Sequence, residues 1–180
     1  MAALLARTAE GDRDAFRELY ALSSRRLYGT VLYMMRERES AQEVVQEAYV
    51  TIWRRASAYD ARRGDPLAWM NAIARNRAVD RLRAERARGF VSYTDTVPEI
   101  ADGDADSGLR SIEALALRRA LVRLKPDFRR ALVLTYFNGY THTELAAVLG
   151  VPVGTAKTWV RRGLIALRES MGESVQEDLS

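Results

Sequence analysis

Four polar and basic side chains near the C-terminal end of the chain are suited to binding a nucleic acid. They are Lys157, Thr158, Arg161 and Arg162. Their spacing of i, i+1, i+4 and i+5 places them on one face of a helix. Arginine is well shaped for two hydrogen bonds to one guanine, and lysine and threonine add contacts to bases or phosphates. Thr155 falls on the same side, outside the apolar stripe of this helix. The pattern predicts a helix that fits the major groove of DNA.

Two short helices around a tight turn would position this face. The first is predicted to begin at a capping box formed by Thr141 and Glu144 and to end at Gly150, since glycine adopts the left-handed backbone of a helix end at little cost. The second follows Pro152. Its apolar stripe consists of Val153, Ala156, Val160, Leu164 and Leu167. Together they predict a helix-turn-helix.

The same spacing also fits an amphipathic helical hairpin whose basic face is merely solvated. Trp159 does not decide between the two interpretations. It lies at the edge of the apolar stripe, where its ring could pack inside, touch the DNA backbone or meet a protein partner.

Three longer helical patterns precede this motif. The first covers about residues 13–36, and its apolar residues are Phe16, Leu19, Tyr20, Leu27, Val31 and Met34. The third begins at Pro66, a residue suited to the first helical position. Its stripe consists of Leu67, Met70, Ala74, Ala78 and Leu82, and Asn76 and Arg83 lie on the other side. Six arginines occur from residue 75 to residue 88. This fits either a nucleic-acid face or a surface helix with local ion pairs.

The second pattern covers about residues 40–57, with Ser40 as the predicted N-cap. Its buried side is predicted to hold Val44, Val45, Ala48, Ile52 and Trp53. The other side carries Glu43, Gln46 and Glu47. These three fit either a solvated acidic face or a surface that meets a basic partner.

Composition excludes several classes of function. The chain has no cysteine, which excludes disulfides, thiol catalysis and zinc-finger sites. A carboxylate metal site in a helical bundle needs Glu-x-x-His pairs, and the one histidine, His142, belongs to none. We therefore expect no cofactor, no metal and no enzymatic activity. The apolar runs are too short for a signal peptide or a membrane span, so we expect a cytoplasmic protein without membrane insertion.

Charge is unevenly distributed along the chain. Residues 1–87 carry 16 basic and 12 acidic side chains, residues 88–112 carry 2 and 5, and residues 113–180 carry 10 and 7. Helical periodicity disappears between residues 88 and 110, where glycine, proline and aspartate accumulate. We expect a flexible acidic linker, although such a segment could also thread a basic channel of a partner.

The order of these segments resembles a bacterial sigma factor. The segments that carry the resemblance are AQEVVQEAYVTIW, AWMNAIARNRAVDRLR and, after the connector, LKPDFRRALVLTYFNGYTHTELAAVLGVPVGTAKTWVRRGLIALRE. The chain is similar to the extracytoplasmic-function (ECF) group, which keeps only regions 2 and 4 of the family, over about residues 12–171. The resemblance implies an all-α fold of two small helical domains: region 2 at residues 1–87, a linker at 88–112 and region 4 at 113–180.

The resemblance also implies functional residues and partners. Glu43, Gln46 and Glu47 match the surface that grips the clamp helices of the polymerase β′ subunit. Tyr59, Arg62 and Arg63 lie in the loop 59–66 that captures a flipped base of the −10 promoter element, and Asn76, Arg77 and Arg83 lie in the helix that follows. Thr155, Lys157, Thr158, Arg161 and Arg162 match the positions that recognise the −35 element. The implied partners are core RNA polymerase (β′ clamp helices and β flap), promoter DNA and an anti-sigma factor.

The chain departs from the family pattern at four positions. These are Gln42, Ala156, Trp159 and Gly163. A glycine within a helix costs about 0.5–1 kcal/mol relative to alanine, so Gly163 predicts either a soft helix end or close packing. A conventional helix-turn-helix regulator that acts without polymerase is the alternative, but it leaves the first 87 residues without a role. A helical interaction protein that binds no DNA is a further one.

Overall fold

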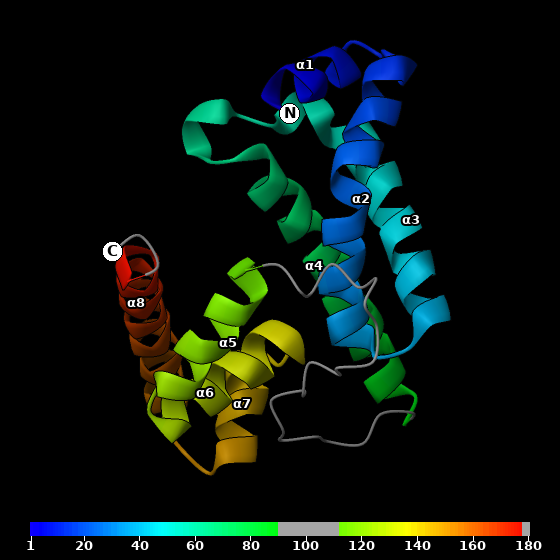
Figure 1. Cartoon of the computed structure of the whole chain (residues 1–180). Helices are drawn as coiled ribbons and strands as arrows, with labels where there is room; N and C mark the ends of the chain where they lie inside the picture. The colour runs from blue at the N-terminus through cyan, green and yellow to red at the C-terminus, as the bar shows by residue number, and fades with distance from the viewer. Residues whose placement is uncertain (90–111, 178–180) are drawn as a thin grey trace. The chain divides into compact units, whose positions relative to one another are not determined.

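The computed structural model describes residues 1–89 and 112–177, which belong to two compact units (Figure 1). Throughout the described residues the secondary structure is helical, which confirms the predicted all-α class and the two helical domains. Most of the predicted linker, residues 90–111, lies outside the described residues, so the exact domain boundaries stay a prediction.

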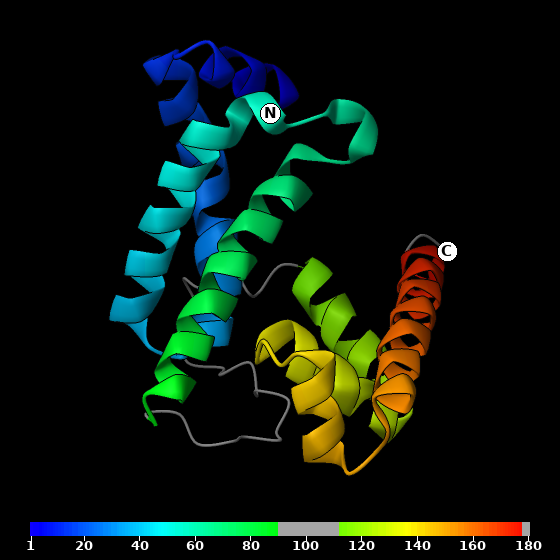
Figure 2. The ribbon, with the colours of Figure 1, turned by 180° about the vertical axis from the view of Figure 1, so that it is seen from behind.

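The first unit is built on three helices that run side by side. They are α2 (Arg13–Met35), α3 (Arg38–Arg55) and α4 (Pro66–Ala87). Figure 2 shows the three from behind. The short helix α1 (Ala2–Ala9) packs against α2 and against η1 (Ala56–Ala58), a 3-10 turn that follows α3. A second 3-10 turn, η2 (Ala61–Arg63), precedes α4. The loop between α3 and α4 is therefore held by short turns at both ends.

The core of the first unit takes side chains from all its long helices. Leu19 and Leu27 of α2, Ile52 of α3 and Met70 of α4 are fully buried. Most of the predicted apolar stripes face this core. Tyr20 is an exception, because 47% of it is exposed and its ring lies at the rim, 4.6 Å from the ring of Tyr49.

The predicted start of α4 is correct, whereas the predicted start of α3 is not. Helix α4 begins at Pro66 as predicted, and the Asp65 carboxylate caps it by accepting from the Ala68 N–H at 3.0 Å. The prediction of Ser40 as N-cap is wrong. Glu37 caps α3, and its carboxylate accepts from the N–H groups of Glu39 and Ser40. A longer acidic side chain, immediately before the helix, fills the role that an N-cap serine usually has.

One polar pair lies inside this core. The hydroxyls of Ser23 and Tyr49 are 2.6 Å apart, and Ser23 also donates to the Leu19 carbonyl. Because Ser23 has a single proton and uses it on that carbonyl, Tyr49 is the donor between the two hydroxyls. Burial raises the pKa of Tyr49 to about 12.

This burial predicts an alkaline weakness of the first unit. The pKa of Tyr49 is higher in the folded chain than the ordinary value of 10.0, so the pair contributes its full stability below pH 10 and loses it as pH rises toward 12. Tyr49→Phe should cost about 1 kcal/mol at pH 7, the usual worth of one hydrogen bond. Urea unfolding at several pH values checks this. The free energy of unfolding should fall less steeply above pH 10 in the variant, and parallel curves would contradict the assignment.

The second unit is a compact group of four helices and one π-helical turn. Its elements are α5 (Ile112–Arg123), α6 (Pro126–Leu132), the π-helical turn η4 (Val133–Phe137), α7 (His142–Leu149) and α8 (Val153–Glu177). Helices α5, α6 and α7 all pack against α8. Leu132, Leu134, Leu145 and Ala156 are among the buried residues of their shared core.

The predicted helix-turn-helix is confirmed as α7, a turn and α8. Thr141 and Glu144 form both halves of the capping box at the start of α7. Gly150 ends α7 with a φ of 66°, a left-handed conformation that favours glycine. The turn is therefore specified by local sequence.

The predicted apolar stripe of α8 is only partly right. Ala156 and Val160 are buried, but Val153 and Leu164 are each 37% exposed. Buried Gly163 explains the exposure of Leu164, because the contact line follows residues 156, 160 and 163 and passes beside Leu164. Val153 is the first residue of α8. A Cβ at Gly163 would lie 3.1 Å from Leu132 Cδ1 and 3.3 Å from the Phe128 carbonyl oxygen. The glycine thus serves close packing of α6 on α8.

Replacing Gly163 by a larger residue should loosen the second unit. Gly163→Val forces Leu132 and the α6 backbone away from α8, and overpacking of this kind costs about 1–3 kcal/mol. Gly154→Val is the matched control in the same helix, because a Cβ there meets nothing within 4 Å. Urea unfolding of the two full-length variants checks the difference. Equal stability of both would show that α6 can move without cost.

Candidate nucleic-acid interface

The first turns of α8 present the five residues that were predicted to contact DNA. Lys157, Arg161 and Arg162 are exposed, and Thr155 and Thr158 are half-buried. All five lie outside the contact line of α8 with the core. The Thr158 hydroxyl donates to the Gly154 carbonyl at 2.8 Å, which leaves its oxygen as an acceptor and its methyl group for apolar contact. The three cations are free of any ion pair among the described residues.

Trp159 packs against the core of the second unit and is half-buried. Of the three roles left open by the sequence, packing is the one that the structure shows. The residue anchors α8 from the side that neighbours the basic face.

The loop between α3 and α4 encloses an aromatic pocket of about 400 Å³. The rings of Tyr59 and Trp69 form one wall, with centroids 5.6 Å apart and planes at 60°. The Tyr59 hydroxyl donates to the Gly64 carbonyl at 3.0 Å, which closes the loop on itself. Arg63 lines the same pocket. A planar ring bound here could contact aromatic faces beside a cation, the combination that single-stranded nucleic acids use.

Arg62 of the same loop does not line the pocket but forms a local ion pair. Its guanidinium pairs with the Asp60 carboxylate at 3.0 Å and lowers the pKa of Asp60. The Asp60 side chain also accepts from the Arg62 N–H and so caps η2. The structure thus brings Tyr59 and Arg63 to the pocket but directs Arg62 to a local ion pair. Sequence reasoning missed Trp69 as a pocket residue.

The predicted residues of α4 are exposed, and one of them is bound to the neighbouring helix. Asn76, Arg77 and Arg83 all lie outside the buried side of α4. Arg77 Nη2 donates to Thr51 Oγ1 of α3 at 3.0 Å. The basic face of α4 is therefore fixed in part from α3.

A second link between α3 and α4 comes from Arg81. Its Nη2 lies 3.0 Å from Glu43 Oε2 of α3, and its Nε lies 3.0 Å from Glu85 Oε1 of α4. The side chains of Arg81 and Glu43 are 39% and 53% exposed, so this ion pair is weak and easily exchanged for another partner. Sequence reasoning missed Arg81. Its i, i+4 spacing to Glu85 was visible, but its approach to Glu43 depends on how the helices pack.

The outer face of α3 carries the three residues predicted to meet polymerase. Glu43, Gln46 and Glu47 are all exposed. Val50, three residues after Glu47 and on the same face, is 50% exposed. An apolar side chain among acidic ones suits a protein contact better than a purely solvated face.

Comparison with known proteins identifies the family of this arrangement. Residues 19–88 match the description of Sigma-70 region 2, and residues 114–167 match that of Sigma-70, region 4. The ECF RNA polymerase sigma factor SigK of Mycobacterium ulcerans (strain Agy99) is 37% identical over 175 residues, which cover 96% of this chain and 94% of SigK. The chain belongs to the ECF sigma factor family.

The chain is similar to two further proteins. The SigK protein of Mycobacterium bovis (strain BCG / Pasteur 1173P2) is 34% identical to this ECF sigma factor over the same shares of both chains. A solved complex of the sigma factor RpoE with the anti-sigma factor NepR from Bartonella quintana covers 87% of this chain and 96% of that one, at 22% identity and a TM-score of 0.40. At that score the superposition is too loose to transfer contacts.

The region 2 match of this ECF sigma factor begins at Leu19, inside α2. Helix α1 and the first residues of α2 lie before it. In the described parts of the chain, no helix combines the length and hydropathy of a membrane span, and no three acidic, histidine or cysteine side chains gather as metal ligands would.

Proposed function

We propose that this ECF sigma factor binds core RNA polymerase through α3 and directs it to promoters that α8 recognises at the −35 element and α4 with its preceding loop recognises at the −10 element. The observation that carries the proposal is that one chain holds both matched regions, each with its own basic face. This function gives the first unit a role, whereas a conventional helix-turn-helix regulator would not need it.

At the −35 element, α8 would enter the major groove of duplex DNA. Lys157, Arg161 and Arg162 neutralise phosphates and approach base edges, with Thr155 and Thr158 beside them. Phosphate neutralisation supplies most of the affinity, and a few base contacts set the register.

At the −10 element, the aromatic pocket would accept a base that has left the helical stack. Removing a base from the helical stack costs free energy. Stacking of that base on the rings of Tyr59 and Trp69 offsets part of this cost. Arg63 lies at the pocket for a neighbouring phosphate, while Asn76, Arg77 and Arg83 contact the strand along α4. Arg62, once released from Asp60, adds a further cation.

Loss of the aromatic wall should weaken binding of single-stranded −10 DNA. Base–aromatic stacking contributes about 1–3 kcal/mol per base, so we expect Tyr59→Ala to reduce affinity by roughly 5- to 150-fold in holoenzyme. Tyr59→Phe keeps the ring and should stay near the original affinity. Fluorescence anisotropy with a −10 oligonucleotide measures both. Tyr20→Ala, in the same unit but outside the pocket, is the control, and an equal loss there would contradict the pocket assignment.

Polymerase docking would use the face of Glu43, Gln46, Glu47 and Val50. Glu43 would then leave Arg81 and pair with the polymerase clamp. Breaking the Arg81–Glu43 ion pair costs little free energy, because both side chains are half-exposed. Polymerase also fixes the spacing of the two DNA-binding units, so the second contact gains effective concentration. Free protein should therefore bind promoter DNA weakly.

A salt titration of promoter binding, with and without core polymerase, tests this function. An ECF sigma factor should bind its promoter tightly and specifically only in the presence of polymerase. A conventional regulator would bind its site tightly alone, commonly as a dimer. Tight specific binding without polymerase would therefore overturn the proposal.

The proposal extends to location and control. The protein acts in the cytoplasm, by binding rather than by catalysis, and an anti-sigma factor holds it inactive by covering polymerase-binding surfaces. Support comes from exposed apolar side chains in both units, among them Val50 in the first and Ile165 in the second. Co-purification from the native host, with identification of the bound protein, tests the control mechanism.

A further inference from the structure

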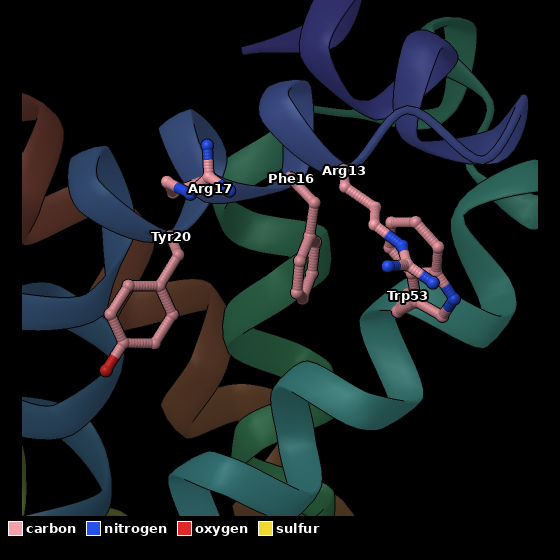
Figure 3. Close-up of a pocket in the computed structure, with 5 residues that line it drawn as sticks. All are labelled: Arg13, Phe16, Arg17, Tyr20 and Trp53. Atoms are coloured by element: carbon pink, nitrogen blue, oxygen red, sulfur yellow. The ribbon is translucent and has the colours of Figure 1, made fainter.

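A groove between α2 and α3 combines two arginines with three aromatic rings. Figure 3 shows Arg13, Phe16, Arg17 and Tyr20 from α2 and Trp53 from α3 around it. The groove has a volume of about 540 Å³. Phe16 and Trp53 form its floor, with ring centroids 5.0 Å apart and planes at 70°. Arg13, Phe16 and Arg17 precede the residues that match region 2.

The cations of the groove are available to a ligand. Among the described residues, no ion pair includes Arg13, which extends beside Trp53 in Figure 3. Arg17 pairs with Asp14, but both side chains are 79% exposed, so this contact is readily exchanged. Tyr20 is 47% exposed at one edge. An anionic group with an apolar or aromatic body suits this combination.

The position of the groove distinguishes it from the DNA-binding face. On α3, Thr51 faces α4 through its hydrogen bond with Arg77, whereas Trp53 faces α2 through its contact with Phe16. Two residues along a helix are about 200° apart, so the groove and α4 lie on opposite sides of α3. A strand that follows α4 would not reach the groove. This geometry favours a protein ligand over a nucleic acid.

The groove continues the face of α3 that we assign to polymerase. Trp53 follows Val50 by three residues and Gln46 by seven, so the three share a side of the helix. The charge changes along this surface, from acidic at Glu43 and Glu47 to basic at Arg13 and Arg17. A partner that covers the whole surface must therefore carry the opposite order of charges.

We propose that the groove binds an acidic peptide segment of a protein partner, anchored by one aromatic or leucine side chain. The apolar anchor lies against Phe16 and Trp53, and flanking carboxylates pair with Arg13 and Arg17. Because this site adjoins the polymerase-docking face, its occupant contacts the first unit at the edge of that face. The choice of a protein ligand rests on the proposed function of α3 and α4, whereas binding of the peptide itself requires neither polymerase nor DNA.

Peptide display on the full-length protein tests the proposal. The probe is a library of random 12-residue peptides on phage, selected on the original chain and counter-selected on Arg13→Glu plus Arg17→Glu. We expect enriched peptides to carry carboxylates on either side of a tryptophan, phenylalanine or leucine. Synthetic copies should bind the double variant at least about tenfold more weakly, because both charge pairs become repulsive.

The control variant is Arg54→Glu plus Arg55→Glu, which makes the same charge change on exposed arginines of α3 outside the groove. It should retain peptide binding. Circular dichroism melting of all variants separates loss of the site from loss of the fold. Failure to enrich peptides on the original chain, or enrichment of basic sequences, would overturn the proposal. A second result would also overturn the proposal. If the original chain binds a 20-nucleotide oligo-dT tightly and only the groove variant loses this binding, the groove binds single-stranded nucleic acid.

Discussion

Glu43→Lys plus Glu47→Lys is expected to lower the affinity for core polymerase by about 100-fold or more. Close charge pairs across interfaces contribute about 1.5–7 kcal/mol each, and reversal replaces two attractions by repulsion from a basic partner. Specific transcription from the cognate promoter should fall in parallel, because the proposed function requires polymerase to fix the spacing of the two DNA-binding units. Competition binding against labelled sigma factor and a run-off transcription assay measure the two effects.

The double reversal also removes the Arg81–Glu43 ion pair, so its effect on the fold needs a separate measurement. Glu43→Gln breaks the pair without reversing the charge and should reduce polymerase affinity far less. Glu10→Lys plus Glu18→Lys makes the same total charge change on exposed residues away from the outer face of α3. If the double reversal transcribes normally while its melting temperature is unchanged, α3 does not dock polymerase through these carboxylates.

Arg161→Ala plus Arg162→Ala should remove discrimination at the −35 element. A bidentate arginine–guanine contact contributes about 1–3 kcal/mol of discrimination, so the pair together is expected to lower promoter binding by roughly 30-fold or more. If both side chains contact phosphate instead, the slope of log K against log salt falls by about 1.8 while discrimination stays. A salt titration of holoenzyme on promoters with intact and scrambled −35 elements separates these two modes of contact.

Arg118→Ala plus Arg119→Ala is the matched control for this experiment. Both residues are exposed on α5 of the same unit, and neither was assigned to DNA. The control should keep the ratio of binding to intact and scrambled promoters. An unchanged ratio in the Arg161 and Arg162 variant would show that α8 does not select the sequence.

Features that depend on one helix at a time could be predicted from the sequence. The capping box of α7, the left-handed Gly150 and the start of α4 at Pro66 are each set by a few neighbouring residues. The periodicity of apolar residues likewise placed the long helices and most of their buried sides. These local rules were enough for the individual helices and for the helix-turn-helix, whereas the all-α fold of two small domains was implied by the resemblance to sigma factors.

Features that depend on how helices meet could not be predicted in this way. The Arg81–Glu43 pair joins residues 38 positions apart, and its geometry follows from the register of α3 against α4. The sequence left Gly163 either in a soft helix end or at a point of close packing, and the neighbour that decides between them, Leu132 of α6, depends on how the helices pack. The aromatic pocket needed Trp69 to approach Tyr59 across a loop. The prediction of Ser40 as N-cap was a local error, because Glu37 caps the N–H groups of Glu39 and Ser40, so Ser40 already lies inside the first turn of α3.

The bonds that Arg77 and Arg81 of α4 make to α3 have a consequence for engineering. Arg77 bonds to Thr51, and Arg81 pairs with Glu43. If α4 alone were replaced by that of a relative, the new helix would lack the α3 residues that hold its own arginines in place. Promoter preference is thus better transplanted as a hairpin, with α3, the loop and α4 exchanged together. The smallest interchangeable part of this unit is a pair of helices.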